Sequence, residues 1–125
     1  MKFTHFRDLQ VWQRSMTLAR SIYSITAPFP PSEAFGLVQQ MRRAAVSVPS
    51  NIAEGHGRPT SKSFALFLSQ ARGSLNELET QLELSIQLGF AKTAQCSAVL
   101  QEIDELARML HALQATLRRP SAQPR

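Results

Sequence analysis

The sequence is poor in the residues that crosslink small proteins or build strands and tight turns. Its 125 residues include one cysteine, one tyrosine and five glycines. Because Cys96 has no possible partner in the chain, an intrachain disulfide is excluded and nothing points to an oxidising compartment. So few glycines and tyrosines argue against the many short strands of an all-β fold. Composition therefore favours an all-α protein with a cytoplasmic location.

Long apolar runs and the local motifs of catalysis are also missing. No stretch of about 18 apolar residues runs without charge, and the N-terminus has no apolar core typical of a signal peptide, so we expect no membrane association. The histidines are far apart, and neither HExxH or CxxC spacing nor a glycine-rich phosphate loop occurs. Glu54 and His56 lie on different faces of a helix. We therefore expect no enzymatic activity, metal or cofactor.

Positive charge gathers in the first part of the chain. Residues 1–72 hold nine Lys or Arg against three Asp or Glu, residues 73–117 hold two against six, and residues 118–125 add three arginines. A basic segment favours an anionic partner such as RNA or DNA, because phosphate binding draws its affinity from Lys and Arg contacts and counterion release. The alternative is that opposite charges neutralise each other between helices or subunits. The sequence leaves both interpretations open.

Apolar side chains recur at alternating steps of three and four, the period of an amphipathic helix, in four stretches. The first helix is expected to start at a cap on Thr4 or Asp8 and to reach about residue 26, and the second to run from Ser32 to the glycines at 55 and 57. The third spans 61 to about 88, and the fourth runs from 93 to a stop at Pro120. These lengths predict an antiparallel up-down-up-down four-helix bundle, one domain over residues 1–119, with a disordered tail at 120–125.

Several residues inside these helices carry more specific expectations. Pro49 removes a backbone donor in the second helix, which predicts a kink or a restart there. Gly55 and Gly57 are expected to adopt the left-handed conformation that ends a helix. Gly73, followed by Ser74, lies in the middle of the third helix, where it predicts close approach of a neighbouring helix. Contact with a phosphate is the alternative at this position.

The first helix presents two apolar rows. One row contains Leu9, Trp12, Met16, Ala19, Tyr23 and Thr26, and the row beside it contains Leu18, Ile22 and Ile25. We interpret Trp12 as a core anchor rather than a base-stacking residue because it lies on the first row. A face this wide predicts packing against more than one helix.

Three segments taken in order carry a more specific pattern. They read FRDLQVWQRSMTLARSIY, FPPSEAFGLVQQMRRAAVSVPSNIAEGHGR and FLSQARGSLNELETQLELSIQLGF. Over roughly residues 6–117 they resemble the 23S rRNA-intervening sequence protein family, or S23, through SVPSNIAEG and GSLNELE in particular. The resemblance implies a bacterial, cytoplasmic four-helix bundle that forms a homo-oligomeric ring, a homopentamer in relatives. A related branch, the accessory proteins of diversity-generating retroelements, binds nucleic acid and a reverse transcriptase.

The basic half and the motif supply two groups of candidate residues. Candidate nucleic-acid contacts are Arg7, Arg14, Arg42, Arg43, Arg58, Lys62 and Arg72. Candidate structural or oligomer-forming residues are Asn51, Glu54, Gly55, Gly73, Ser74 and Glu77.

Each group also has an internal interpretation. The two glutamates could pair with arginines inside the bundle or across a subunit interface, namely with Arg42, Arg43 or Arg72. Asn51 could satisfy the carbonyl freed by Pro49. Two hypotheses follow: a ring that binds RNA or DNA phosphates without sequence readout, and an oligomeric scaffold that binds a protein encoded nearby.

Overall fold

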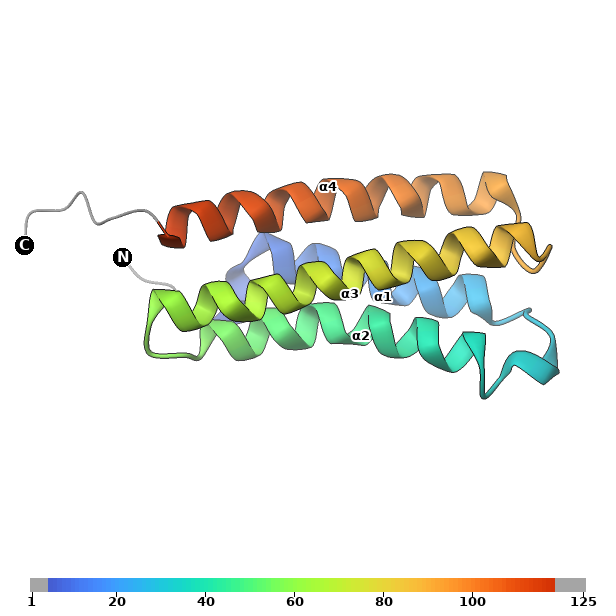
Figure 1. Cartoon of the computed structure of the whole chain (residues 1–125), viewed down its shortest axis with the longest axis horizontal. Coiled ribbons are helices and arrows are strands. Elements are labelled where there is room, and N and C mark those ends of the chain that lie inside the picture. Colours follow the sequence, from blue (N-terminus) through green and yellow to red (C-terminus); the bar gives the residue numbers. More distant parts are fainter. Residues whose placement is uncertain (1–4, 119–125) are drawn as a thin grey trace, which may run out of the picture.

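Four helices make up the structure, a computed structural model that describes residues 5–118 (Figure 1). Their bounds are Gln10–Thr26 for α1, Leu37–His56 for α2, Ser61–Gln87 for α3 and Thr93–Arg118 for α4. Two 3-10 turns, η1 at Phe6–Asp8 and η2 at Pro31–Glu33, precede α1 and α2. The described residues contain no strand, which confirms the all-α prediction. The predicted cap Thr4 and the predicted tail at 120–125 lie outside the described residues.

Consecutive helices run in opposite directions and pack side by side, and α1 also packs against α4. The start of α1, the end of α2, the start of α3 and the end of α4 therefore lie together at one end of the bundle (Figure 1). The predicted antiparallel four-helix bundle is confirmed. No helix in the described part of the chain has both the length and the hydropathy needed to cross a membrane.

Aliphatic side chains from all four helices fill one core. The largest fully buried ones are Leu18, Ile22, Met41, Ile52, Leu68, Leu75, Leu78, Leu82, Ile103, Leu106 and Leu110. Burial of each such side chain stabilises the fold by about 1.5–3 kcal/mol. On α1 the whole second predicted row is buried, whereas in the first row Leu9, Ala19 and Thr26 are buried, Trp12 packs at the edge of the core and Tyr23 is 45% exposed. The core-anchor role predicted for Trp12 is therefore only partly fulfilled.

The starts of α1 and α2 differ from the predictions. Leu9 occupies the N-cap position of α1 and makes no side-chain hydrogen bond there, so Asp8 is not the cap. α2 begins at Leu37 rather than Ser32, because Gly36 has a non-helical conformation that separates η2 from α2. Glu33 still serves this helix, since its Oε1 accepts a hydrogen bond from the Leu37 amide at 3.4 Å.

α2 continues through Pro49 as one helix, so of the predicted kink or restart the restart does not occur, and the kink stays a prediction. Val48 and Ile52 beside the proline are fully buried, and their burial offsets the cost of about 3 kcal/mol of an interior proline. Asn51 donates from Nδ2 to the Ser47 carbonyl at 2.8 Å and to Ser47 Oγ at 3.0 Å. The carbonyl freed by a proline belongs to the residue four positions earlier, so the role predicted for Asn51 is also wrong.

The end of α3 is the place where a glycine adopts the left-handed conformation. Gly89 has φ 80°, the one positive φ in residues 5–118. The Phe90 amide bonds to the Ser85 carbonyl at 2.9 Å, which completes a Schellman motif. Gly57 has φ −81° and Gly55 lies inside α2, so the left-handed conformation predicted for both is wrong.

Close approach between α2 and α3 occurs at Gly55. A Cβ atom placed there would lie 2.7 Å from Phe67 Cβ and 2.9 Å from Phe64 Cδ1. A Cβ atom at Gly73 would have nothing within 4 Å. The close approach predicted at Gly73 is therefore absent within residues 5–118.

Candidate nucleic-acid interface

Four exposed cationic side chains lie at the end of the bundle where α1 starts and α4 ends. They are Arg7 of η1, Arg58 just after α2, Lys62 in the first turn of α3 and Arg118 at the end of α4. We call this set the basic end. Two acidic residues, Asp8 and Glu54, lie in the same region, so positive charge predominates there.

Most of this charge is not engaged inside the bundle. The side chains of Arg7, Lys62 and Arg118 form no hydrogen bond or ion pair within residues 5–118. Arg58 pairs with Glu54, with Nη2 3.1 Å from Oε2, and its guanidinium carbon lies 4.7 Å from the centre of the Phe67 ring. An exposed ion pair of this kind contributes only about 0.2–1 kcal/mol. Arg58 can therefore exchange its carboxylate for a phosphate at little cost.

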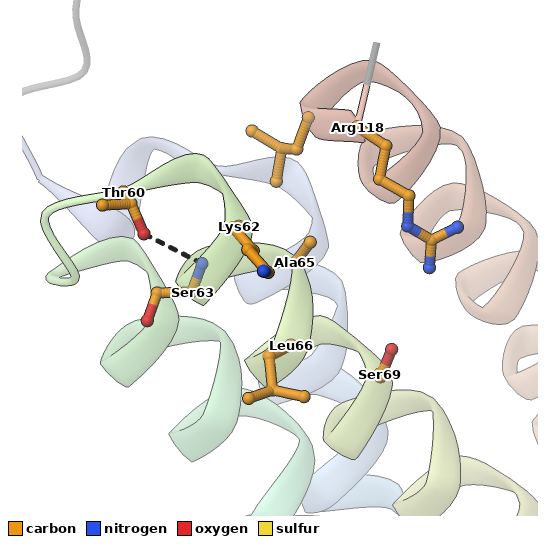
Figure 2. Close-up of a pocket in the computed structure, with 8 residues that line it drawn as sticks. Thr60, Lys62, Ser63, Ala65, Leu66, Ser69 and Arg118 are labelled. Carbon is orange, nitrogen blue, oxygen red and sulfur yellow. Dashed lines mark hydrogen bonds between the residues drawn. The ribbon is translucent and has the colours of Figure 1, made fainter. Parts of the chain in front are cut away.

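A groove of about 680 Å³ opens between the first turns of α3 and the last turn of α4 (Figure 2). Its lining residues are Thr60, Lys62, Ser63, Ala65, Leu66, Ser69, Leu117 and Arg118. Thr60 caps α3, because its Oγ1 accepts a hydrogen bond from the Ser63 amide at 3.1 Å. The groove thus combines two cationic side chains with several hydroxyl groups, which are the groups that contact phosphate oxygens.

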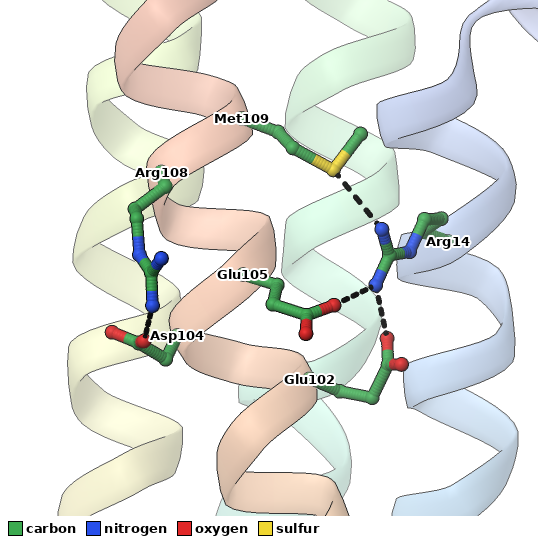
Figure 3. A network of polar contacts seen from close by, with 6 residues as sticks. All are labelled: Arg14, Glu102, Asp104, Glu105, Arg108 and Met109. Carbon is green, nitrogen blue, oxygen red and sulfur yellow. Dashed lines mark hydrogen bonds and ion pairs between the residues drawn. The ribbon is translucent and has the colours of Figure 1, made fainter.

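Arg14 joins α1 to α4 through polar contacts (Figure 3). Its Nη2 donates to Glu105 Oε1 at 2.6 Å and to Glu102 Oε1 at 3.1 Å, and its Nη1 lies 3.3 Å from Met109 Sδ. The hydrogen bond from Arg14 lowers the pKa of Glu105, and the same bonds raise the pKa of the guanidinium. Arg14 is therefore committed to a structural contact.

Arg42 and Arg72 are also engaged inside the bundle. Arg42 donates from Nε to Thr26 Oγ1 at 2.9 Å and from Nη2 to the Tyr23 carbonyl at 3.3 Å, and its guanidinium carbon lies 4.4 Å from the Tyr23 ring centre. It thereby satisfies a carbonyl in the last turn of α1. Arg72 donates from Nη1 to Gln114 Oε1 at 2.8 Å. Neither guanidinium is free for a ligand in this arrangement.

Gln114 is a structural residue that the sequence reasoning missed. It is fully buried, and its Nε2 donates to the Ala65 carbonyl at 2.9 Å and to Ser69 Oγ at 2.6 Å. Together with Arg72 it joins α3 to α4 through polar groups. The burial of Gln114 could have been predicted from its position four residues after Leu110, because this position continues the buried row of α4.

The acidic motif residues do not make the pairs predicted for them within the described chain. Glu54 pairs with Arg58 instead, and neither Glu77 nor Arg43 forms an ion pair within residues 5–118. Ser74 does make a contact between helices, since its Oγ lies 2.8 Å from Ser47 Oγ on α2.

Groups suited to metal or covalent chemistry do not come together in the described structure. No cluster of three His, Cys, Asp or Glu side chains within residues 5–118 could hold a metal ion. Cys96 is buried, and burial raises the pKa of its thiol, which disfavours the reactive thiolate.

The fold and this surface define an antiparallel four-helix bundle with one cationic end. The family described as 23S rRNA-intervening sequence protein matches residues 7–112, and the chain belongs to this family. A similar crystal structure is that of a protein of unknown function from the S23 ribosomal protein family of Bacteroides thetaiotaomicron, with 23% sequence identity and a TM-score of 0.75, covering 83% of this chain and 97% of the other. This likeness shows the shared fold. Comparison with curated proteins gives no significant match.

Proposed function

We propose that the protein is a non-catalytic bundle that assembles into a ring and binds RNA or DNA phosphates at its basic end without reading sequence. The observation that supports this proposal is the group of exposed cations at the basic end, Arg7, Lys62 and Arg118, whose side chains have no hydrogen bond or ion pair within residues 5–118. Lys62 and Arg118 also line the groove between α3 and α4. Such side chains contact phosphate oxygens, and their affinity comes largely from the release of counterions.

A ring makes such a modest patch effective. When the symmetry axis runs along the helices, every copy presents its basic end on the same face of the ring. One nucleic-acid chain can then touch several copies, and each contact after the first is intramolecular, which raises the overall affinity without any new kind of contact. A pentamer, as implied by the family resemblance, would place the basic ends of all its copies around one face of the ring.

The proposal uses part of the predicted set of cations. Three of the predicted arginines are bonded inside the bundle, so we retain Arg7, Arg58 and Lys62 for nucleic-acid contact. We add Arg118, which lies on the groove and was not selected from the sequence. Arg43 lies on α2 away from the basic end and is treated separately below.

The engagement of Arg14, Arg42 and Arg72 favours the second candidate function, an oligomeric protein-interaction scaffold. In that function the arginines serve internal contacts and the ring binds a protein encoded nearby. The two functions differ in an observable way, because a scaffold keeps its partner after nuclease treatment.

Fluorescence anisotropy with labelled RNA and duplex DNA of random sequence, measured over a range of salt, tests the proposal. We expect binding at low salt and a linear fall of log affinity with log salt. Lys62→Glu should weaken binding to every sequence and reduce the salt slope by about one per lost contact. Lys92→Glu, the same reversal at the opposite end of the bundle, is the control and should have little effect.

Absence of binding at low salt, or equal losses in the two variants, would overturn the proposal. A protein partner that survives nuclease treatment, combined with no binding of nucleic acid, would support the scaffold instead.

A further inference from the structure

The outer surface of α3 carries a row of exposed residues with a glycine near its centre. The row contains Leu66, Gly73, Glu77, Leu84 and Leu88, which follow one another at steps of seven and four and therefore share one helix face. We call this row the α3 stripe. Its three leucines are 59, 44 and 52% exposed, in chain order. Glycine is a poor helix former, and no helix in the described part of the chain approaches to use the space that Gly73 leaves.

A groove between α1 and α2 is the second apolar feature of the surface. One part has a volume of about 630 Å³ and is lined by Trp12, Met16, Tyr23, Val46 and Pro49, among others. An adjoining hollow shares Tyr23 and Val46 and also contains Phe35, Val38, Arg42 and Arg43. We call the two parts together the α1–α2 groove. It contains apolar and aromatic side chains that the core does not cover.

The six large exposed apolar side chains within residues 5–118 divide evenly between these two surfaces. The groove has Tyr23, Phe35 and Val46, and the stripe has Leu66, Leu84 and Leu88. Because the two surfaces belong to different helices, one copy of the chain can use both at once. An interface that joins two different surfaces is heterologous, and heterologous interfaces close into rings when the rotation between copies permits.

The contact between α2 and α3 shows which residues of the two surfaces lie at the same height along the bundle axis, that is, at the same level. The 2.8 Å contact between Ser47 Oγ and Ser74 Oγ places these two residues at one level. Both helices rise by about 1.5 Å per residue and run in opposite directions, so positions equally far from this pair also share a level. The close approach of Gly55 to Phe67 agrees with this alignment.

Rotation about an axis along the helices moves each copy around the ring without shifting it along the axis. A residue on the stripe of one copy therefore meets groove residues of the same level in the next copy. Counted from the serine pair, Gly73, Glu77 and Leu84 lie level with residues 48, 44 and 37 of α2. The groove residues within two positions of these are Val46 and Pro49 for Gly73, Arg43 for Glu77, and Val38 for Leu84. The smallest residue of the stripe thus faces the protruding Val46, and an acid faces a base.

Charge supports the same match. Glu77 and Arg43 are both exposed, and neither has an ion pair within residues 5–118. Arg20 and Arg42 also line the groove, so its surroundings are basic. The acid of the stripe therefore faces a basic groove, as complementary surfaces require.

We infer that the α3 stripe of one copy docks into the α1–α2 groove of the next copy, with Gly73 facing Val46 and Pro49, and Glu77 paired with Arg43. The partner of this surface is a second copy of the chain. The inference refines the ring-forming part of the proposed function and rests on it. It assigns Arg43 to assembly rather than to nucleic acid, and it gives Gly73 the close contact that it lacks within one chain.

Charge reversal, read by multi-angle light scattering, tests the pairing. Glu77→Arg or Arg43→Glu alone places like charges at every interface and should shift the mass towards that of the monomer. The double variant, Glu77→Arg with Arg43→Glu, should recover the wild-type mass, a recovery that an unrelated structural role of either residue would not produce. Single variants that keep the wild-type mass, or a double variant that stays dissociated, would overturn the inference.

A steric test uses the glycine. Gly73→Leu should dissociate the assembly while circular dichroism still shows a folded, helical chain. Ala112→Leu, which adds the same side chain at an exposed position of α4, should leave the mass unchanged. Retention of the assembly by Gly73→Leu, or equal dissociation in both variants, would count against the interface.

The mass of the wild-type protein separates failure of this interface from failure of the proposed function. A monomeric wild-type protein would overturn the ring and the interface together. A wild-type multimer that is insensitive to every variant would overturn the interface alone. Absorbance at 260 and 280 nm on the same chromatographic peaks, at low and high salt, reports bound nucleic acid independently.

Discussion

The two faces of α3 meet different surroundings although they belong to one helix. On its inner face, Phe67 fills the space left by Gly55, Ser74 contacts Ser47, and the buried Gln114 of α4 bonds to α3. On its outer face, a Cβ atom placed at Gly73 would have no neighbour within 4 Å among residues 5–118. The close approach of Phe67 explains why a glycine occupies position 55. A mid-helix glycine costs about 1 kcal/mol relative to alanine, and Gly73 has no such neighbour within residues 5–118; the proposed interface would use the open space beside it.

Substitution of the inner glycine should have the largest effect on folding. Gly55→Leu would force a side chain against Phe67 Cβ and the Phe64 carbonyl, which cannot move without separating α2 from α3. We expect a loss of about 3 kcal/mol in the free energy of unfolding, measured by denaturant titration. Gly57→Leu is the control, because its Cβ would lie 3.6 Å from the nearest carbonyl oxygen, an ordinary contact. Equal losses in both variants would show that packing at Gly55 is not the cause.

The polar part of the inner face should be the next most sensitive. Gln114→Leu keeps a side chain of similar size but removes the amide that bonds to Arg72, Ser69 and the Ala65 carbonyl. We expect the free energy of unfolding to fall by about 1 kcal/mol, since Arg72 and Ser69 can form hydrogen bonds with water instead. Gln101→Leu, at an exposed position of the same helix, should change the free energy of unfolding by less than about 0.5 kcal/mol. An unchanged stability for Gln114→Leu would mean that the buried amide network contributes nothing.

The helices and their arrangement were predictable because apolar steps of three and four recur without a break in each stretch. The orientation of α1 was not, because its two apolar rows lie side by side on one broad face. Packing against both α2 and α4 buries all of the row with Leu18, Ile22 and Ile25 but only part of the other row, and leaves Trp12 at the edge. Only the positions of the other helices decide between such rows.

The candidate site was predictable in part. Arg7, Arg58 and Lys62 lie together because helix ends alternate in an antiparallel bundle, and the same reasoning leads to Arg118. The engagement of Arg14 was not predictable, because its partners Glu102 and Glu105 are 88 and 91 residues away in the sequence. That contact arises only when α1 lies against α4.

Substitution of the outer glycine should have the opposite sign to that of the inner one. Gly73→Ala improves helix propensity at a position with open space, so it should raise the free energy of unfolding of the dissociated chain by about 0.5–1 kcal/mol. Denaturation should be followed at a protein concentration at which light scattering gives the monomer mass. A loss of stability under those conditions would reveal a contact of Gly73 within the chain and remove the contrast between the two faces.

The smallest effect on the single chain is expected at Glu77. Its carboxylate makes no ion pair within residues 5–118, so Glu77→Gln should leave the free energy of unfolding of the monomer within about 0.5 kcal/mol. In an assembly that uses the α3 stripe, however, the same change removes one ion pair at every interface, and these small losses accumulate around the ring. Dissociation on dilution should therefore occur at a higher protein concentration for Glu77→Gln than for Glu79→Gln, which neutralises an exposed charge outside the stripe. High salt should reduce the difference between the two variants because it screens exposed pairs. If both variants dissociate alike at low salt, net charge rather than a pair at Glu77 governs assembly, and the outer face of α3 is no more specific than the rest of the surface.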